Sequence, residues 1–417
     1  MPVSIPDNND LFSFVETEAI PENAAHWERE HFIPVARADW RVLITDAAVQ
    51  GGLDHDQFEE FCALLDTLIH MLTYHDNASI SESYSLVDPD NIGGRLVGVA
   101  RVDEYDGRCQ TVIRQFDQIM ARGNYQKLSR TELLEALDKA SEFGIPMQAN
   151  FSVFKRIAVY VRGKVVGQRT RRRAFNFYRK EELDVPLFQR LVICFQVTED
   201  ATAKDEHRHD CLYIKSFKNI PQHDIDMLLP GTSVRMSFVD RGKIALPTIS
   251  GLAMLTFRIV FLASMGLFAF LGLLFTTSGY AVKSIFGYIR TKDRYQHSLT
   301  KNLYYQNLGN NAGVLQQMQM EAEVQDIQEC LLGYTMLITK FPDGATMGQL
   351  DKAAEDFIQE VVKFPVDFEV DDALRKLVRL NIVSVTPQRM YLACSLDQAS
   401  VQLQAGFAQN FTNYNSD

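Results

Sequence analysis

A chain of 417 residues with 46% hydrophobic and 23% charged residues has the composition of a globular protein of two or three domains, and not of a polytopic transporter. Its net charge of −11 argues against a nucleic-acid partner, because phosphate binding needs clustered Lys and Arg. Six cysteines without a Cys-x-x-Cys pair argue against a disulfide framework or a zinc site and suit a reducing compartment.

The N-terminal third is predicted to be helical. Residues 1–23 are expected to form a flexible acidic N-terminus, whose lack of Lys and Arg argues against a signal or transit peptide. A helical N-terminal region at 24–145 follows, where apolar residues recur at helical spacing. Its helices are predicted at Ala36–Val49, Asp54–Thr73, Cys109–Met120 and Thr131–Phe143, with a connection at Ala78–Gly94 and a capping box at Ser129 and Glu132.

Residues 146–243 are predicted to form an α+β sheet region. Met147–Val161, Pro186–Val197 and Cys211–Phe217 are rich in Val, Ile, Phe and Tyr, which are common in strands. The links between them are too short for helical crossovers. We therefore expect a mostly antiparallel sheet.

A hydrophobic segment at residues 244–289 is interrupted only by Arg258 and Lys283. It contains 24 consecutive uncharged residues. A spanning helix needs roughly 20 apolar residues, so the segment is predicted to lie in a membrane. Basic flanks on both sides favour a transmembrane hairpin, while a single span and a soluble hairpin stay open. The pattern predicts an integral membrane protein of the bacterial inner membrane or an equivalent, with cytoplasmic soluble domains.

Residues 290–340 are predicted to form juxtamembrane helices. Helical patterns at 299–308 and 314–337 are separated by Gly309-Asn310-Asn311. Tyrosines and amides at 304–311 make a polar-aromatic patch. Docking against the α+β block is the favoured interpretation of this patch, and ligand binding is the alternative.

The C-terminal region at 341–400 has the order helix, helix and two-stranded wing, which is typical of a winged-helix-like domain. Thr346 and Gln349 have capping-box spacing at its start. Residues 401–417, rich in Gln and Asn, are expected to fray as a tail. The expected fold class is therefore α+β: N-terminal helices, a small mostly antiparallel sheet, a transmembrane helical hairpin and a C-terminal helical winged-helix-like domain.

Several short motifs resemble the transmembrane protein 143-like family, an uncharacterised membrane domain family. Those before the hydrophobic segment are Phe217-Lys218-Asn219-Ile220-Pro221, Asp224, Met227-Leu228-Leu229-Pro230-Gly231 and Arg235. Those after it are Lys283-Ser284, Gly287-Tyr288, Leu303-Tyr304-Tyr305-Gln306-Asn307-Leu308 and Asn310-Asn311-Ala312-Gly313-Val314-Leu315. Phe32-Ile33-Pro34-Val35 with Arg37 is a weaker match. The resemblance covers most of residues 28–395. It implies a membrane protein of unknown biochemical function with two spans and supplies no catalytic residues.

The clearest charged cluster is a basic run that includes Arg169, Arg171, Arg172 and Arg173. Such a run can contact anionic lipid headgroups, at about 1 kcal/mol per basic residue near a membrane surface. A solvated loop between two strands is the alternative interpretation. Nucleic-acid stacking with the neighbouring aromatic residues is disfavoured by the acidic net charge.

Two further patterns have simple structural interpretations. His207 and His209 could hold a metal, but Arg208 lies between them, so an exposed hairpin tip is favoured. The winged-helix-like pattern suggests DNA binding through the second helix. However, acidic residues outnumber basic ones over 341–400, which favours protein contact.

The leading functional hypothesis is a membrane-anchored, non-enzymatic scaffold or interaction protein. Its expected partners are membrane lipid and an unknown protein, and its oligomeric state is open. The alternatives are a membrane-tethered nucleic-acid-binding regulator and an enzyme acting on a lipid or membrane-derived substrate. No catalytic, cofactor-binding or metal-binding residue is assigned, and whether the chain is an enzyme stays open.

Overall fold

The computed structural model describes residues 29–91, 102–134, 147–148, 151–172, 180–202, 207–222, 225, 228–230, 233–234 and 305–414. Its helices are α1 (Arg37–Gln50), α2 (His55–Ser85), α3 (Val102–Arg122), the 3-10 turn η3 (Phe151–Val153), α5 (Glu199–Thr202), α8 (Asn311–Lys340), α9 (Met347–Val361), α10 (Val370–Arg379) and α11 (Leu396–Tyr414). Its strands are β1 (Gln126–Lys127), β2 (Met147–Gln148), β3 (Phe154–Arg172), β4 (Lys180–Val197), β5 (Tyr213–Pro221), β6 (Ser233–Val234), β7 (Asn307–Asn310), β8 (Val383–Val385) and β9 (Tyr391–Ala393).

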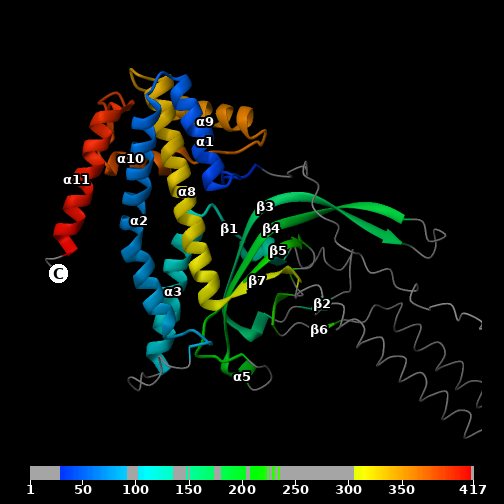
Figure 1. The fold of residues 1–417 in the computed structure, drawn as a ribbon. Coiled ribbons are helices and arrows are strands. Elements are labelled where there is room, and N and C mark those ends of the chain that lie inside the picture. Colours follow the sequence, from blue (N-terminus) through cyan, green and yellow to red (C-terminus); the bar gives the residue numbers. More distant parts are fainter. Residues whose placement is uncertain are drawn as a thin grey trace, which may run out of the picture.

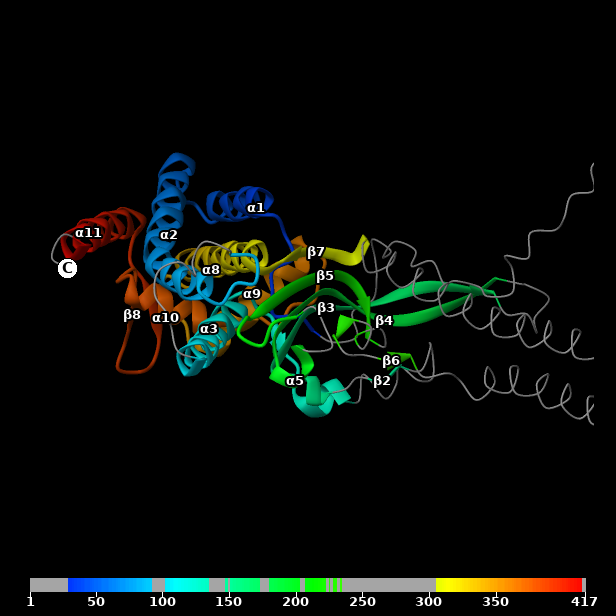
Figure 2. The same cartoon turned by 90° about the horizontal axis from the view of Figure 1, so that it is seen from below.

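An antiparallel sheet in the order β1-β3-β4-β5-β7 lies beside a group of helices (Figure 1). The long β3–β4 hairpin extends well beyond the other strands (Figure 2). The predicted α+β class and the antiparallel sheet are therefore confirmed. The strands alternate their side chains between two buried faces, which explains the runs of β-branched and aromatic residues.

Helix α8 connects the sheet to the helical part of the molecule. Its N-terminal half packs in a core between the sheet and α2–α3, around Phe116 and Tyr160. Its C-terminal half packs in a helical core around Trp40, Phe61 and Tyr334. Figure 1 shows α8 running from the edge of the sheet into the middle of the helices. Residues of α8 that contact the sheet are therefore only a few helical turns from residues of α8 that contact the C-terminal helices.

Two predicted boundaries in the N-terminal half and after the hydrophobic segment were wrong. Helix α2 continues to Ser85, through the Ser- and Asn-rich stretch that was expected to be a connection. Ile80 and Tyr84 are buried at helical spacing, so tertiary packing outweighs the weak helix propensity of that stretch. Residues 307–310 form strand β7, and not the end of a helix, because their backbone pairs with β5.

The C-terminal elements follow the predicted order of two helices and a hairpin. Helix α9 begins at Thr346 with the expected capping box to Gln349, and β8 pairs with β9. A bridge between Ala345 and Tyr391 adds a third extended segment. The predicted frayed tail is wrong over most of its length. Helix α11 reaches Tyr414 and packs on α2, with Leu403 fully buried.

In the described part of the chain, no helix combines the length and the apolar character that a bilayer crossing requires. The two longest described helices, α2 with 31 residues and α8 with 30, carry charged side chains along their length. This finding overturns the predicted transmembrane helical hairpin. It also overturns the predicted integral membrane location with cytoplasmic soluble domains. Residues 244–289, on which that prediction depended, lie outside the described residues.

Candidate functional site

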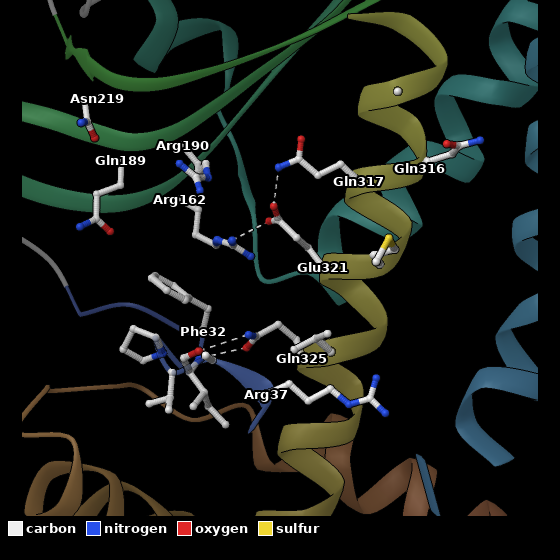
Figure 3. A pocket seen from close by; sticks show the side chains of 17 residues that line it. Phe32, Arg37, Arg162, Gln189, Arg190, Asn219, Gln316, Gln317, Glu321 and Gln325 are labelled. Atoms are coloured by element: carbon white, nitrogen blue, oxygen red, sulfur yellow. Dashed lines mark hydrogen bonds and ion pairs between the residues drawn. The ribbon is translucent and has the colours of Figure 1, made fainter. Parts of the chain in front are cut away.

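A cavity of about 900 Å³ lies between the sheet, α8 and the segment that precedes α1 (Figure 3). Its lining comprises Phe32, Ile33, Pro34, Val35, Ala36, Arg37, Arg162, Gln189, Arg190, Asn219, Gly313, Gln316, Gln317, Met320, Glu321, Val324 and Gln325. The α8 residues recur every three or four positions, which puts them on one face of the helix. The wall is apolar along the N-terminal segment and polar along the strands and α8.

The strand wall is basic because the residues on the helix-facing side of the sheet change from apolar to basic along the strands. Near α3 that side is apolar, with Tyr160 and Val192 paired across β3 and β4. One position pair further along, the register places Arg162 opposite Arg190, and Arg190 opposite Lys218. Residues directly opposite one another share a face, and like charges in that position repel. The sheet therefore presents a row of three cations.

Arg162 is neutralised within the protein. Its guanidinium donates to the Glu321 carboxylate at 2.6 Å and to the Gly123 carbonyl at 2.9 Å. It also lies 4.8 Å from the Phe32 ring centre and 4.3 Å from that of Tyr125. The Tyr125 hydroxyl donates to the same carboxylate oxygen at 2.7 Å. Arg162 and Glu321 thus form a fixed pair between β3 and α8.

Arg190 has no such partner among the described residues. Its Nε is buried and makes no hydrogen bond within the described residues, and no ion pair joins it to any of them. Figure 3 shows its side chain beside Arg162, on the cavity wall. A buried N–H without an acceptor costs free energy, and the guanidinium charge, which borders the cavity, can pair with an anion bound there. Arg190 is therefore the residue in the lining best placed to hold an anionic group.

Amide side chains complete the polar wall. Gln317 donates to Glu321 at 2.9 Å, and Gln325 bonds both backbone groups of Ile33. Gln189 and Asn219 extend from the strands toward the same space (Figure 3). Gly163, with φ of +76°, lies against Gln189 so closely that any Cβ would collide with it. The lining can donate to an anion while also accepting hydrogen bonds from hydroxyl or amide groups.

A second charged cluster lies two turns along α8, where it meets α3 and α10. Its members, which we call the junction cluster, are Arg122, Asn124, Asp326, Glu329, Asp372 and Lys376. Arg122 donates to Asp326 at 2.6 Å, and Asn124 to Glu329 at 2.7 Å. The Lys376 ammonium contacts Asp326 at 2.5 Å and Glu329 at 3.5 Å, and it also contacts Asp372.

The junction cluster is a closed structural network. The three carboxylates approach one another as metal ligands would, but the ammonium of Lys376 already lies among them. Burial raises the pKa of Glu329 to about 8, against the opposing effects of Lys376 and Asn124. The pKa of Lys376 is also raised, because Glu329 and Asp326 outweigh the effect of its burial. Glu329 therefore keeps its proton to a higher pH than an exposed carboxyl group does.

The family-like motif residues mainly connect the sheet to α8. Phe217 and Pro221 are buried in β5, and Asn307 and Asn310 pair with that strand in β7. Asn311, with φ of +52°, makes the turn into α8. Tyr305 lies at the surface, and Gln306 donates to the Asn219 carbonyl. Pro230 lies outside any helix or strand, and Gly313 lines the cavity. Asp224, Arg235 and Tyr304 lie outside the described residues.

Three of these sequence blocks meet at the cavity. Phe32 to Val35 with Arg37, Asn219 and Gly313 are far apart in sequence, yet all contribute to its lining. The sequence did not indicate Arg190 or Glu321 as site residues. A charged residue within the apolar strand 186–197 was the one available signal for Arg190. Glu321 carried no signal, because an acidic residue on a helix is ordinarily solvated.

Arg169, Arg171 and Arg172 of the basic run, and the basic residues of α10, are not among the described residues that line the cavity. The backbone of Arg169, Arg171 and Arg172 is in β3, where the register sets Arg171 opposite Glu181, and Arg173 lies outside the described residues. Lipid contact by these residues stays a prediction. On α10, Arg375 pairs with Asp371 and Asp372, and Lys376 is in the junction cluster.

The histidine pair is divided between two environments. The His207 ring lies between those of Phe195 and Tyr213, at 5.4 and 4.7 Å between ring centres. His209 lies 3.9 Å from Glu199. His207 is therefore packed against the end of the sheet, and not at the exposed hairpin tip that the sequence favoured. Among the described residues, the two histidines do not share a set of metal ligands.

The chain is similar over residues 154–313 to a family described as "Protein of unknown function (DUF3754)". The match includes β3, β4, β5 and the start of α8, and so the strand wall of the cavity. It gives no activity, and it does not test the resemblance to the transmembrane protein 143-like family. No solved structure matches the chain. The cavity therefore has to be interpreted from its own chemistry.

Proposed function

We propose that this protein is a non-catalytic binding protein for a small organic anion, carried as a carboxylate or a phosphate. The observation that carries the proposal is Arg190, a cation in a cavity wall with a buried N–H and no acceptor among the described residues. Of the three lining arginines, Arg162 pairs with Glu321 and Arg37 with Asp66, so among the described residues Arg190 is the lining cation without a counter-charge, in a chain whose net charge is −11. A locally positive cavity in an acidic protein selects anions.

The same lining supports binding in preference to catalysis. Among its described residues there is no Ser, Thr, Cys, His or Lys that could act as a nucleophile or transfer a proton. Its one carboxylate, Glu321, is held by Arg162, Tyr125 and Gln317. Phe32, Val35 and Met320 add an apolar surface, which suits the carbon skeleton of an organic anion.

The proposal is tested by thermal unfolding of the full chain with inorganic phosphate, glycerol 3-phosphate and citrate. Binding to the folded state raises the Tm as ligand concentration increases. Arg190→Gln removes the charge and should weaken binding at least about tenfold, because a charge-assisted hydrogen bond contributes about 1.5–3 kcal/mol. Arg190→Lys keeps the charge but loses the fork geometry, so it should fall in between.

Arg379→Gln is the matched control. It removes the same charge from an exposed position on α10, outside the cavity. This variant should respond to the anions as the wild type does. Equal responses of Arg190→Gln and the wild type, or no response of the wild type to any of the three anions, would contradict the proposed function.

A further inference from the structure

The segment that forms the apolar wall of the cavity is also bonded to the C-terminal helices. We call residues 29–36 the strap. At Glu30 its backbone forms a parallel bridge with Val366, and the Asp367 amide donates to the Glu30 carbonyl at 2.9 Å. The Glu30 carboxylate, 5% exposed, accepts from the amides of Gly163 and Lys164 in β3. One residue thus connects the α9–α10 link to the strand that carries Arg162.

Buried amides of α8 hold the next part of the strap. Gln325 donates to and accepts from the backbone of Ile33, at 3.3 and 2.9 Å. Gln328 donates to the Val35 carbonyl at 2.8 Å. Both glutamines are nearly inaccessible to solvent. If the strap moved, these polar groups would be left buried without partners, so partial loosening is costly. The strap therefore has a defined docked state.

The junction cluster contacts the strap from the other side. Asn124 donates to the His31 carbonyl at 3.0 Å and to Glu329 at 2.7 Å. The His31 ring faces the α9–α10 link, with its Nδ1 3.1 Å from the Asp367 carbonyl and 3.7 Å from Glu369. The docked strap is thus bonded to the sheet, α8, the turn after α3 and the C-terminal helices.

We propose that the strap is a ligand-controlled latch: an anion in the cavity stabilises the docked strap and, through it, the attachment of α9–α10 to the rest of the protein. This inference depends on the proposed function. A ligand on Arg190 contacts the strap because Phe32 to Ala36 form the facing wall, and Phe32 already lies under Arg162. Thermodynamic linkage makes the two effects equal. The factor by which a bound ligand favours the docked strap is also the factor by which undocking of the strap lowers the affinity for the ligand.

The test is hydrogen exchange of the full chain, read by mass spectrometry, in the wild type and in Glu30→Gln. The substitution keeps the size of the side chain but removes the charge that strengthens its bonds to the β3 amides. We expect exchange at 162–165 and at 363–369 to accelerate together, by about tenfold, while α2 is unchanged. Glu360→Gln, at an exposed position on α9, is the control and should change neither segment.

Inorganic phosphate is the probe for the ligand step. It should slow exchange at 29–36 and 363–369 in the wild type and have no such effect in Arg190→Gln. A rise in Tm with phosphate but no slowing at 363–369 overturns the latch and leaves the binding function standing. Acceleration at only one segment in Glu30→Gln also overturns the latch. No effect of phosphate, glycerol 3-phosphate or citrate on either Tm or exchange overturns the binding function, and with it ligand control of the strap.

Discussion

Two charged clusters lie within a few turns of each other on α8, and they differ in whether their charges are matched. In the junction cluster, Lys376 and Arg122 are surrounded by carboxylates. In the cavity, Glu321 neutralises Arg162, while Arg190 has no partner in the described residues. The first cluster also lies inside packed helices, whereas the second borders a cavity of about 900 Å³.

The difference separates stability from binding. A cluster that is completed by its own side chains contributes to the fold, and removing one member leaves an uncompensated buried charge. A cation that the fold leaves without an acceptor, beside open volume, provides binding energy for an external anion.

Lys376→Met is expected to have the largest effect. It leaves three carboxylates together without the ammonium, which should destabilise the protein by about 3–5 kcal/mol in denaturant unfolding. Arg375→Met, one residue away and exposed, should change stability by no more than about 0.5 kcal/mol. Similar losses for the two variants would show that the junction cluster is not a closed network.

Arg162→Met should come second, at about 2 kcal/mol, because it leaves the half-buried Glu321 without its cation. The measurement is again the free energy of unfolding. Arg37→Met is the comparison, since its pair with Asp66 at 2.8 Å is more exposed. A smaller loss for Arg162→Met than for Arg37→Met would contradict the fixed pair across the cavity.

The pH dependence of unfolding should report on Glu329. Its folded pKa of about 8 is above the unfolded value, so the native state keeps a proton that the unfolded chain releases. The stability that this bound proton contributes is fully present below the unfolded pKa. It is lost as the pH rises through the folded pKa of about 8. Glu329→Gln cannot lose this proton. Between the unfolded pKa and about 8, the wild type should lose stability relative to this variant by about 1 kcal/mol per pH unit. Parallel profiles would contradict a protonated Glu329.

Arg190→Met should have the smallest effect on the free protein, a gain in stability of no more than about 1 kcal/mol, because among the described residues the cation makes no bond that would be broken and its buried N–H without an acceptor is removed. Denaturant unfolding in a buffer without phosphate or carboxylates measures it. A loss comparable to that of Arg162→Met would mean that Arg190 has a structural partner.

Local signals in the sequence predicted local structure well. The capping boxes at Ser129–Glu132 and Thr346–Gln349 form as expected, because each involves residues three apart. The predicted helix at Asp54–Thr73 ended too early, because the burial of Tyr84 depends on contacts with the sheet. One of them is the hydrogen bond from the Tyr84 hydroxyl to the Leu212 carbonyl. Tertiary contacts of that kind cannot be read from composition.

The cavity could not be predicted from the sequence for the same reason, because the residues that line it are far apart in the chain. Arg162 and Glu321 are separated by 159 positions, and the strap meets Gln325 across 292. Only the folded sheet puts Arg190 beside Arg162, through a register that the sequence does not specify. The prediction of a membrane protein depended on hydropathy at 244–289 alone, and it was wrong by the evidence of the described helices.

The central claim is that Arg190 is open to an external anion while Arg162 is not. The most direct measurement is the Nε–H signal of each arginine in a ¹⁵N spectrum of the full chain, assigned with Arg190→Gln and Arg162→Met. Titration with inorganic phosphate should shift the Arg190 signal in a saturable way and leave that of Arg162 nearly unchanged. An unmoved Arg190 signal, or a shift no larger than that of the exposed Arg379, would contradict the account.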